Sequence, residues 1–260
     1  MHVEASKREI ISQRLRQIEA KHSVRILYAC ESGSRAWGFP SADSDYDVRF
    51  LYLHPTKWYL SINRGRDVIE EPIHDDFDIN GWDLRKALGL LQKSNPPLME
   101  WLGSPIVYLE NPPVIEKIRN VLPRFYSSGS CFSHYLHMAK GNFREHLKGE
   151  TVRTKKYFYV LRPVLAMQWI EQDLGVVPTD FNILVQRLVQ DPVLLGDIQI
   201  LLQKKMAGAE LQSGPRIESI SSFIEAELLR FAGMERAREA RAPISVLDDL
   251  FQHALRICWA

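Results

Sequence analysis

The sequence predicts an α+β protein built from two units, on three observations. Up to about residue 110, short strand-like segments occur between helical patterns. Over residues 111–260, hydrophobic residues recur at helical spacing almost throughout. A chain of 260 residues is also long enough for two units that each bury a core. We therefore expect a mixed α/β unit over residues 1–110 and a helical unit over residues 111–260.

The elements of the first unit follow from its hydrophobic periodicity and from the residues that interrupt it. The pattern predicts one helix and then three strands, over residues 6–21, 24–29, 46–53 and 72–80. A second helix is expected over residues 83–93, with Asp83 as the N-cap that accepts hydrogen bonds from the first turn. Asn95-Pro96-Pro97 ends this helix, because a residue before proline avoids the helical conformation.

Proline also marks two later positions. Asn111-Pro112-Pro113 separates the mixed part of the sequence from the helical part. Pro163 lies inside a helical pattern, where proline either ends the helix or kinks it.

The composition excludes several classes of protein. Hydrophobic residues make up 45% and charged residues 25% of the chain, which is typical of globular proteins and not of disordered or fibrous ones. No uninterrupted hydrophobic run exceeds five residues, whereas a membrane-spanning helix needs about 20. Cys30, Cys131 and Cys258 are widely spaced and form neither a disulfide framework nor a zinc motif. We expect a cytoplasmic protein with no membrane partner.

The net charge of +1 conceals one strongly basic stretch. Residues 111–162 contain ten basic and three acidic residues, whereas acidic residues are in excess both before and after them. A local positive field of this kind suits a triphosphate or the end of a nucleic acid.

The strand predicted over residues 46–53 begins beside two carboxylates. Asp45, Asp47 and Arg49 alternate with apolar residues, so they share the face of the strand opposite to Tyr46 and Val48. Adjacent carboxylates repel each other unless a cation lies between them. Hard oxygen ligands of this type suit Mg²⁺, which takes substrate phosphates as further ligands. Two such ions can bind the attacking and leaving oxygens of phosphoryl transfer.

The loop before this strand has the residue types that bind phosphate. Gly33 allows backbone N–H groups to approach an anion closely, Ser34 offers a hydroxyl donor, and Arg35 adds positive charge. On its own, Gly33 also fits an ordinary turn, and Asp45 and Asp47 fit solvated loop acids. Their order between two predicted strands favours a nucleotide site.

These motifs resemble the nucleotidyltransferase superfamily that includes DNA polymerase β. Longer segments of the sequence are similar to the bacterial predicted nucleotidyltransferase family found in association with RNA ligases. These segments are ESGSRAWGFPSADSDYDVRFLY, DINGWDLRKAL, KSNPPLMEWL and KKYFYVLRP. The resemblance implies a polymerase β-like mixed sheet with flanking helices, followed by an all-helical C-terminal domain that covers the nucleotide cleft.

The resemblance also implies roles for individual residues. Gly33 and Ser34 correspond to the pair that holds the β- and γ-phosphates, and Asp45 and Asp47 correspond to the paired metal-binding acids. A third carboxylate comes from a neighbouring strand, for which Asp78 is preferred. Asp76 is the alternative. Asp75 is disfavoured, because it would lie on the same face of the strand as Phe77, which is expected to point into the core.

Further nucleotide contacts are expected from basic and aromatic residues. In similar enzymes a helical domain offers a lysine and an aromatic ring to the nucleotide, which here suggests Lys156 and Arg162 for phosphate and Tyr157 for stacking. A solvated basic helix start is the alternative. Arg49 either neutralises the acids, contacts phosphate, or serves as a structural ion-pair partner.

Together these features predict an enzyme that transfers a nucleoside monophosphate from an NTP such as ATP to an acceptor hydroxyl. Two Mg²⁺ ions are expected as cofactors, with Mn²⁺ as a substitute. The association with RNA ligases favours an RNA end as acceptor in RNA repair and an RNA ligase as partner. A protein or small-molecule acceptor is an alternative, as is a nucleotide-binding or antitoxin-like regulatory protein without catalysis.

Overall fold

The computed structural model describes residues 3–63, 65–208, 213–237 and 239–259. The chain divides into two compact units. The sheet unit comprises Met1–Ala36, Asp45–Tyr126 and Ala240–Ala260, and the helical unit comprises Trp37–Ser44 and Ser127–Glu239. The division thus differs from the boundary expected at residue 110.

The sheet unit is built on five strands in the spatial order β3-β4-β2-β1-β5. The strands are β1 (Arg25–Glu31), β2 (Tyr46–Leu53), β3 (Val68–Glu70), β4 (Phe77–Asp83) and β5 (Val107–Glu110). β2 and β4 are parallel, and the other three pairings are antiparallel. The sheet is therefore mixed, as expected.

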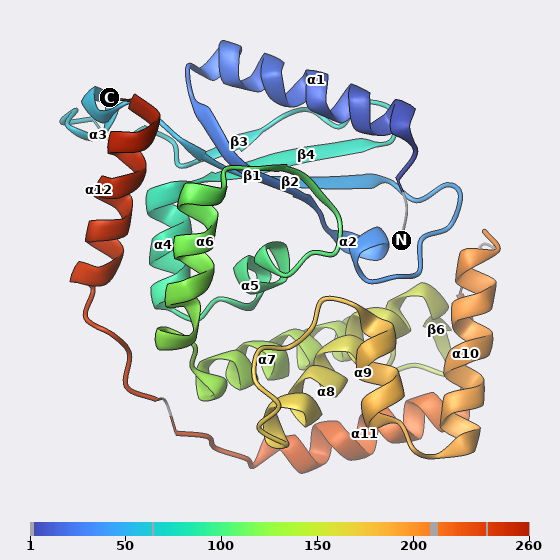
Figure 1. Ribbon diagram of the computed structural model, residues 1–260. Helices are drawn as coiled ribbons and strands as arrows, with labels where there is room; N and C mark the ends of the chain where they lie inside the picture. Colours follow the sequence, from blue (N-terminus) through green and yellow to red (C-terminus); the bar gives the residue numbers. More distant parts are fainter. Residues whose placement is uncertain (1–2, 64, 209–212, 238, 260) are drawn as a thin grey trace. The chain divides into compact units, whose positions relative to one another are not determined.

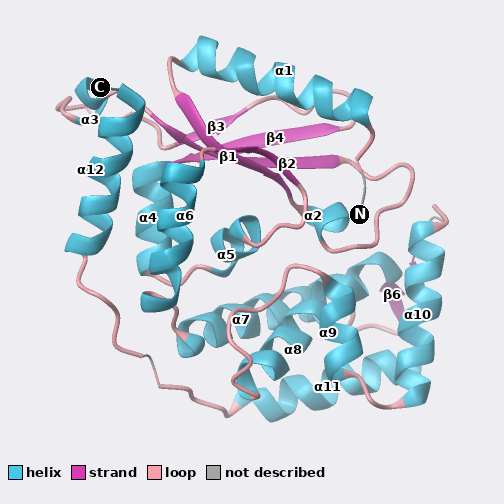
Figure 2. Ribbon diagram, viewed as in Figure 1, coloured by secondary structure: helices cyan, strands magenta, loops and turns pink. Residues whose placement is uncertain are grey.

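Helices cover both faces of this sheet (Figure 1, Figure 2). α1 (Ala5–His22) packs on one face, where its apolar residues join alternate strand residues such as Val48 and Phe50. The other face carries α4 (Leu84–Gln92), α5 (Pro96–Leu102), α6 (Pro112–Val121) and α12 (Ser245–Trp259). Because both faces are buried, β1 is apolar from Ile26 to Cys30 and β2 is apolar from Phe50 to Leu53.

Side-chain caps fix the helix starts on that second face. Asp83 accepts a hydrogen bond from the backbone N–H of Arg85 at 2.8 Å, which confirms it as the N-cap of α4. Asn95 caps α5 in the same way through the N–H of Leu98 at 3.2 Å, and Pro96 occupies the first turn.

Two helices explain why the division lies elsewhere than at residue 110. α6 buries Val114 and Ile118 in the core of the sheet unit, and α12 adds Leu247, Leu250 and Ala254 to the same core. Helical periodicity shows that these segments are helices, but it does not show which core they join. The sheet unit therefore includes both of them.

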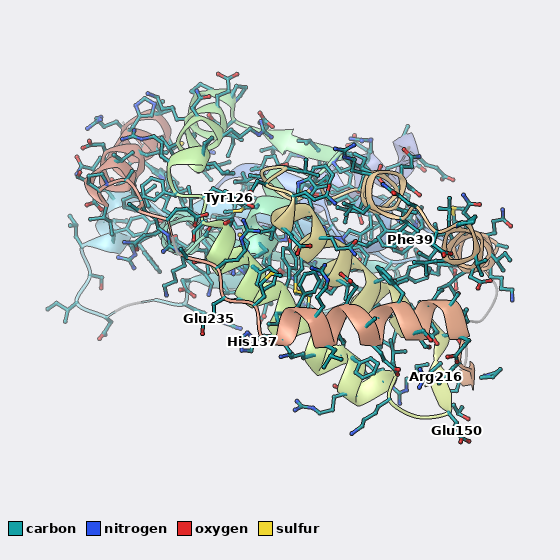
Figure 3. The ribbon with its side chains drawn as sticks, turned by 90° about the horizontal axis from the view of Figure 1, so that it is seen from below. Phe39, Tyr126, His137, Glu150, Arg216 and Glu235 are labelled. Carbon is teal, nitrogen blue, oxygen red and sulfur yellow. The ribbon has the colours of Figure 1, made fainter. Side chains whose placement is uncertain are left out.

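The helical unit consists of five longer helices and one short pair of antiparallel strands among its described residues. They are α7 (Ser128–His146), α8 (Phe158–Glu171), α9 (Phe181–Leu188), α10 (Pro192–Met206), α11 (Glu218–Ala232), β6 (Thr151–Arg153) and β7 (Ser213–Pro215). Pro163 lies inside α8, which continues through it. In Figure 3, Glu150 and Arg216 flank the strand pair at one end of α11, and Glu235 follows its other end.

The remaining short elements connect these helices and strands. They are α2 (Gly33–Ala36), α3 (Thr56–Tyr59), η1 (Leu122–Arg124) and η2 (Thr154–Tyr157). Within the described ranges, no helix combines the length and the apolar content needed to cross a membrane.

Candidate functional site

The two strand carboxylates predicted from sequence lie side by side in the sheet. Asp47 on β2 and Asp78 on β4 are partners in the parallel register. Asp45 directly precedes β2 and is exposed. Tyr46 and Val48 are buried while Asp47 is half-buried, so the predicted alternation of faces is confirmed. Strand pairing therefore places the carboxylates of Asp47 and Asp78 on one face of the sheet.

Arg49 connects these two carboxylates. Its Nη2 donates to Asp47 Oδ1 at 3.2 Å and to Asp78 Oδ2 at 2.7 Å, and its Nη1 donates to the carbonyl oxygen of Asp78 at 2.8 Å. The geometry shows Arg49 as an ion-pair partner of both acids, which fits the expected neutralising role and the expected structural role equally well. The guanidinium group is 14% exposed, so solvent screens the pair of ionic contacts only in part.

The environment of Asp47 disfavours its negative charge. Burial raises the pKa of the Asp47 carboxyl, and the neighbouring carboxylates of Asp78 and Asp45 raise it further. Arg49 and Arg35 act in the opposite direction, but the net direction is upward. A carboxylate in such surroundings is stabilised by any additional cation.

Gly33 lies in direct contact with this carboxylate. The residue has a φ of +57°, and a Cβ atom at this position would lie 1.9 Å from Asp47 Oδ2. The backbone N–H of Ser32 donates to the carbonyl oxygen of Asp47 at 2.8 Å, which ties the turn to the strand. Only glycine fits both the conformation and the close approach. The Gly33–Ser34 turn and the acids therefore form one cluster.

Arg35 is held against the entrance of β2. Its guanidinium group lies 3.9 Å from the ring centroid of Tyr46, and its Nε donates to the carbonyl oxygen of Asp45 at 3.3 Å. Ser34 is half-buried in the same single turn, α2. The positive charge of Arg35 thus lies close enough to oppose the rise that burial causes in the pKa of Asp47.

Glu31 is a site residue that the sequence reasoning missed. Its buried carboxylate accepts the backbone N–H of Asp47 at 2.8 Å and the hydroxyl group of Tyr108. Burial raises the pKa of Glu31 to about 7, against the opposing effect of the Tyr108 hydrogen bond. A glutamate at the end of an apolar run, two residues before Gly33, was the available signal. Tyr108 gave none, because its strand is too short to show alternation.

The structure distinguishes among the candidates for the third carboxylate. Asp76 forms an ion pair with Lys7 at 2.7 Å, and its backbone carbonyl accepts the N–H of Tyr46. Asp75 occupies a turn with a φ of +56°. Asp78 is the one paired with Asp47 in the register, so it fits the preferred assignment best.

The donor chemistry of this cluster suits Mg²⁺, which prefers carboxylate oxygens. Among the described residues, however, no three His, Cys, Asp or Glu side chains are arranged as ligands of one ion. The guanidinium group of Arg49 binds one oxygen of Asp47 and one of Asp78. An ion bound by these carboxylates would therefore share them with Arg49.

The other three residues expected to bind nucleotide belong to the helical unit. Tyr157 is fully buried, and its hydroxyl group bonds Ser221 Oγ at 2.7 Å, so the expectation that it stacks on a base does not agree with its packing. Arg162 is 3% exposed and lies over the ring of Trp37, which makes it a packing residue. Lys156 is half-buried, with its ammonium group 4.5 Å from the ring centroid of Tyr159.

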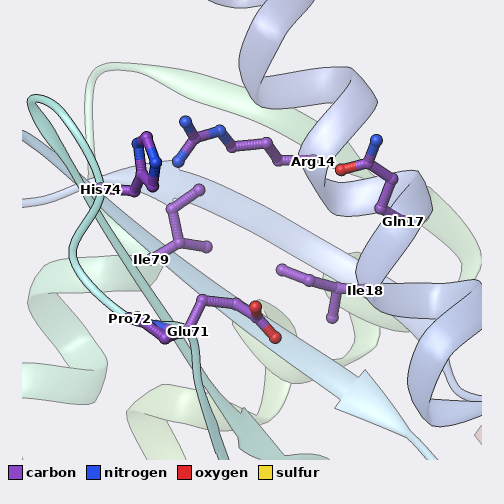
Figure 4. A pocket seen from close by; sticks show the side chains of 7 residues that line it. All are labelled: Arg14, Gln17, Ile18, Glu71, Pro72, His74 and Ile79. Atoms are coloured by element: carbon purple, nitrogen blue, oxygen red, sulfur yellow. The ribbon is translucent and has the colours of Figure 1, made fainter.

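A separate cavity of about 320 Å³ opens beside α1 (Figure 4). Seven residues from α1, β4 and the β3–β4 connection line it, namely Arg14, Gln17, Ile18, Glu71, Pro72, His74 and Ile79. None of them belongs to the predicted site. The carboxylate cluster is therefore the candidate site on the basis of its chemistry.

Comparison with known proteins assigns the family. The sequence model of the RNA repair pathway DNA polymerase beta family matches residues 7–253, which is most of the chain. The chain belongs to this family. The polymerase β-like nucleotidyltransferase resemblance and the α+β fold class expected from sequence are thereby confirmed.

Relatives of this RNA repair pathway polymerase β family member share most of its length. "Uncharacterized protein YcgL" of Bacillus subtilis (strain 168) is 50% identical over 257 residues, which is 97% of this chain and 98% of that protein. A solved nucleotidyltransferase-like protein from Exiguobacterium sibiricum 255-15 is 13% identical, with a TM-score of 0.31 over 85% of this chain and 75% of that chain.

Proposed function

We propose that this chain transfers a nucleoside monophosphate from an NTP to a hydroxyl group at an RNA end and releases pyrophosphate. The observation that carries the proposal is the cluster of Gly33, Asp47 and Asp78 in a member of a polymerase β-like family of RNA repair. The β2–β4 register sets the two carboxylates side by side, and the glycine brings a turn of the chain against Asp47.

Each group of the cluster has a task in this reaction. The backbone of Gly33 and the hydroxyl of Ser34 bind the β- and γ-phosphates, and Arg35 adds positive charge. The acceptor hydroxyl oxygen forms a bond to the α-phosphorus while the bond from that phosphorus to the bridging oxygen breaks. Pyrophosphate leaves with the electron pair, and Asp78 accepts the hydroxyl proton.

Asp45, Asp47 and Asp78 are the residues that would hold Mg²⁺, or Mn²⁺ in its place. When bound, the metal supplies charge neutralisation on the triphosphate and a lower pKa for the acceptor hydroxyl. The contribution of the protein is the fixed spacing of the acids, because positioning and electrostatics carry most of the rate in phosphoryl transfer.

A second candidate function rests on Arg49. Because its guanidinium group already binds both Asp47 and Asp78, part of their negative charge is compensated without a metal ion. This favours, as the alternative, a nucleotide-binding regulatory protein without catalysis.

One experiment separates these functions. The purified protein is incubated with each α-³²P-labelled NTP, Mg²⁺, and RNA that carries either a free or a blocked 3′-hydroxyl, in parallel with Asp47→Asn. Label in the free-ended RNA only, lost in Asp47→Asn, supports the proposal. Label in protein or in a small molecule identifies a different acceptor. Saturable NTP binding without any transfer supports the regulatory alternative.

A further inference from the structure

The segment between the two site motifs is part of the helical unit. Residues 37–44, here called the strap, belong to that unit, whereas Ala36 and Asp45 at its two ends belong to the sheet unit. The strap thus begins directly after α2, which contains the glycine turn, and ends directly before Asp45, the first carboxylate. Whatever fixes the strap also restricts these two motifs.

Aromatic packing holds the first half of the strap. The ring of Phe39 stacks on that of Phe158 at 4.6 Å between centroids and meets the ring of Phe181 edge-on at 5.6 Å. The backbone N–H of Phe181 donates to the carbonyl oxygen of Trp37 at 2.9 Å. Phe39 is 2% exposed, so its ring is buried, whereas Trp37, Gly38 and Pro40 beside it are half-buried.

Gly38 allows the close contact between the strap and α9. It has a φ of +93°, and a Cβ atom there would lie 2.9 Å from Asp180 Oδ1 and 2.8 Å from Asn182 Nδ2. Asp180 is also the N-cap of α9, since it accepts the N–H of Asn182 at 2.8 Å. The strap therefore packs directly on the start of that helix.

A buried lysine holds the second half of the strap. Lys205 of α10 is 9% exposed, and its Nζ donates to Ser41 Oγ and, at 3.3 Å, to Ser44 Oγ. The two serine hydroxyls lie 2.9 Å apart, and the backbone N–H of Ser41 donates to Ser44 Oγ at 2.9 Å. The hydrogen bond from Ser41, aided by the charges of Lys205 and Lys155, lowers the pKa of Asp43.

The placement of this ammonium group is energetically demanding. A buried charge is tolerated only where hydrogen bonds and nearby opposite charge compensate for the lost hydration. Lys205 finds hydrogen-bond partners in the strap, at Ser41 and Ser44. An apolar residue would fill the same space more simply, so the polar contacts of Lys205 specify the path of the strap.

We propose that Lys205 is a positioning residue for the candidate site. It fixes Ser44, and Asp45 follows one peptide bond later, within about 3.8 Å between Cα atoms. Together with the packing of Phe39, it sets the separation at which the chain leaves the Gly33–Ser34 turn and enters β2. The effect of Lys205 on catalysis rests on the proposed function, whereas its effect on the order of the two motifs does not.

Backbone hydrogen exchange in the full-length protein tests this role. Lys205→Met keeps an unbranched side chain, one atom shorter, and removes its charge. Lys204→Met, at the exposed neighbouring position, is the matched control. We expect Lys205→Met to raise exchange roughly tenfold at residues 32–36 and 45–47 while β1 and β4 stay protected. Exchange in Lys204→Met is expected to match that of the wild type.

Kinetics provide a second measurement. If nucleotide transfer is detected, Lys205→Met is expected to lower kcat by roughly tenfold with little change in the KM for NTP, since the parts of the site persist but are misaligned. If the wild type transfers nothing, the proposed function fails and the exchange result still decides the role of Lys205.

Two results overturn the proposal. One is raised exchange confined to residues 37–44, and the other is exchange at residues 32–36 and 45–47 that matches the wild type. If Lys205→Met raises exchange throughout the helical unit, the milder variant Ser41→Ala decides between the same outcomes.

Discussion

Asp47 and Asp78 are register partners on the parallel strands β2 and β4, and the guanidinium group of Arg49 binds both of their carboxylates. The separation of the acids is thus set by strand pairing, which is among the stiffest relationships in a fold. Local sequence links Asp47 only to Asp45 and Arg49. The partnership with Asp78 exists only in the folded sheet.

Asp47→Asn is expected to abolish transfer without weakening the fold. Activity should fall by roughly a hundredfold or more, because a proposed metal ligand is lost. The midpoint of thermal unfolding should stay equal or rise, because burial raises the pKa of Asp47 and the neutral amide avoids that unfavourable charge. Transfer assays and calorimetry on the same sample measure both effects.

Asp75→Asn is the control for this substitution, since Asp75 is exposed in a turn. Asp75→Asn should leave the transfer activity and the midpoint of thermal unfolding unchanged. A marked drop in the unfolding midpoint of Asp47→Asn would show that the charge of Asp47 stabilises the strand pair, contrary to our expectation.

Arg49→Met is expected to make stability depend on divalent metal. Without the guanidinium group, Asp47 and Asp78 face each other with no cation between them, so the free energy of unfolding should fall by about 1–3 kcal/mol. Millimolar Mg²⁺ should restore part of that loss, because an ion bound only by the folded chain stabilises it. Thermal unfolding with Mg²⁺ and with EDTA measures the difference.

The wild type should show a smaller Mg²⁺ shift than Arg49→Met. Arg66→Met, which removes an exposed ion pair with Glu70, should show no change in metal response. Equal Mg²⁺ shifts in the wild type and Arg49→Met would mean that the metal does not bind between these acids.

Gly33→Ala is expected to damage both the fold and the site. A methyl group there would lie 1.9 Å from Asp47 Oδ2 at a φ of +57°, so the turn or the carboxylate must move. We expect a loss of about 1–3 kcal/mol in the free energy of unfolding. Urea unfolding curves measure it.

Gly89→Ala serves as the opposite case. Gly89 lies inside α4, where an added Cβ would contact nothing within 4 Å. Alanine should stabilise this helix by about 0.5–1 kcal/mol and leave activity unchanged. If Gly33→Ala caused no loss in the free energy of unfolding, as expected for Gly89→Ala, the turn would not approach Asp47 as closely as described.

His54 predicts a loss of stability in acid. It is 9% exposed and stacks on Trp58 at 4.0 Å between ring centroids. Burial, and then the charge of His22, lowers the pKa of His54 to about 4. The unfolded chain takes up the proton at a higher pH than the folded protein, so the stabilisation is complete above about pH 6.5 and declines as the pH falls toward 4.

His54→Phe keeps an aromatic ring against Trp58 and removes the titration. Urea unfolding at about pH 7 and about pH 4.5 should show a smaller acid loss in this variant than in the wild type, by about 1–3 kcal/mol. An identical acid loss in both proteins would contradict a neutral His54 in the folded state.

Much of the sheet unit was predictable, because periodicity and caps are local signals. The strand over residues 46–53 and the capping role of Asp83 agree with the structure. β3, β5, β6 and β7 were missed, because three or four residues are too few to show alternation.

The candidate site was predictable where its residues lie close together in the sequence. Gly33, Asp45 and Asp47 stand within one loop and strand. Parity left both Asp76 and Asp78 as third acids, and the family-like segment around Asp78 favoured that residue. The family resemblance suggests that Tyr157 contacts the nucleotide. In the structure, however, Tyr157 is buried and its hydroxyl group is hydrogen-bonded to Ser221. The tie between Lys205 and Ser41 spans 164 residues, and no sequence pattern indicates such a contact.

The core of the sheet unit has a consequence for the order in which the protein forms. α12 supplies Leu247, Leu250 and Ala254 to that core, yet it follows the entire helical unit along the chain. During translation, the strands that carry Asp47 and Asp78 leave the ribosome long before the helix that covers their apolar surface. A nascent chain that stops before residue 245 therefore contains the strands of the candidate site but lacks Leu247, Leu250 and Ala254, so the core beneath those strands is incomplete until α12 has been made.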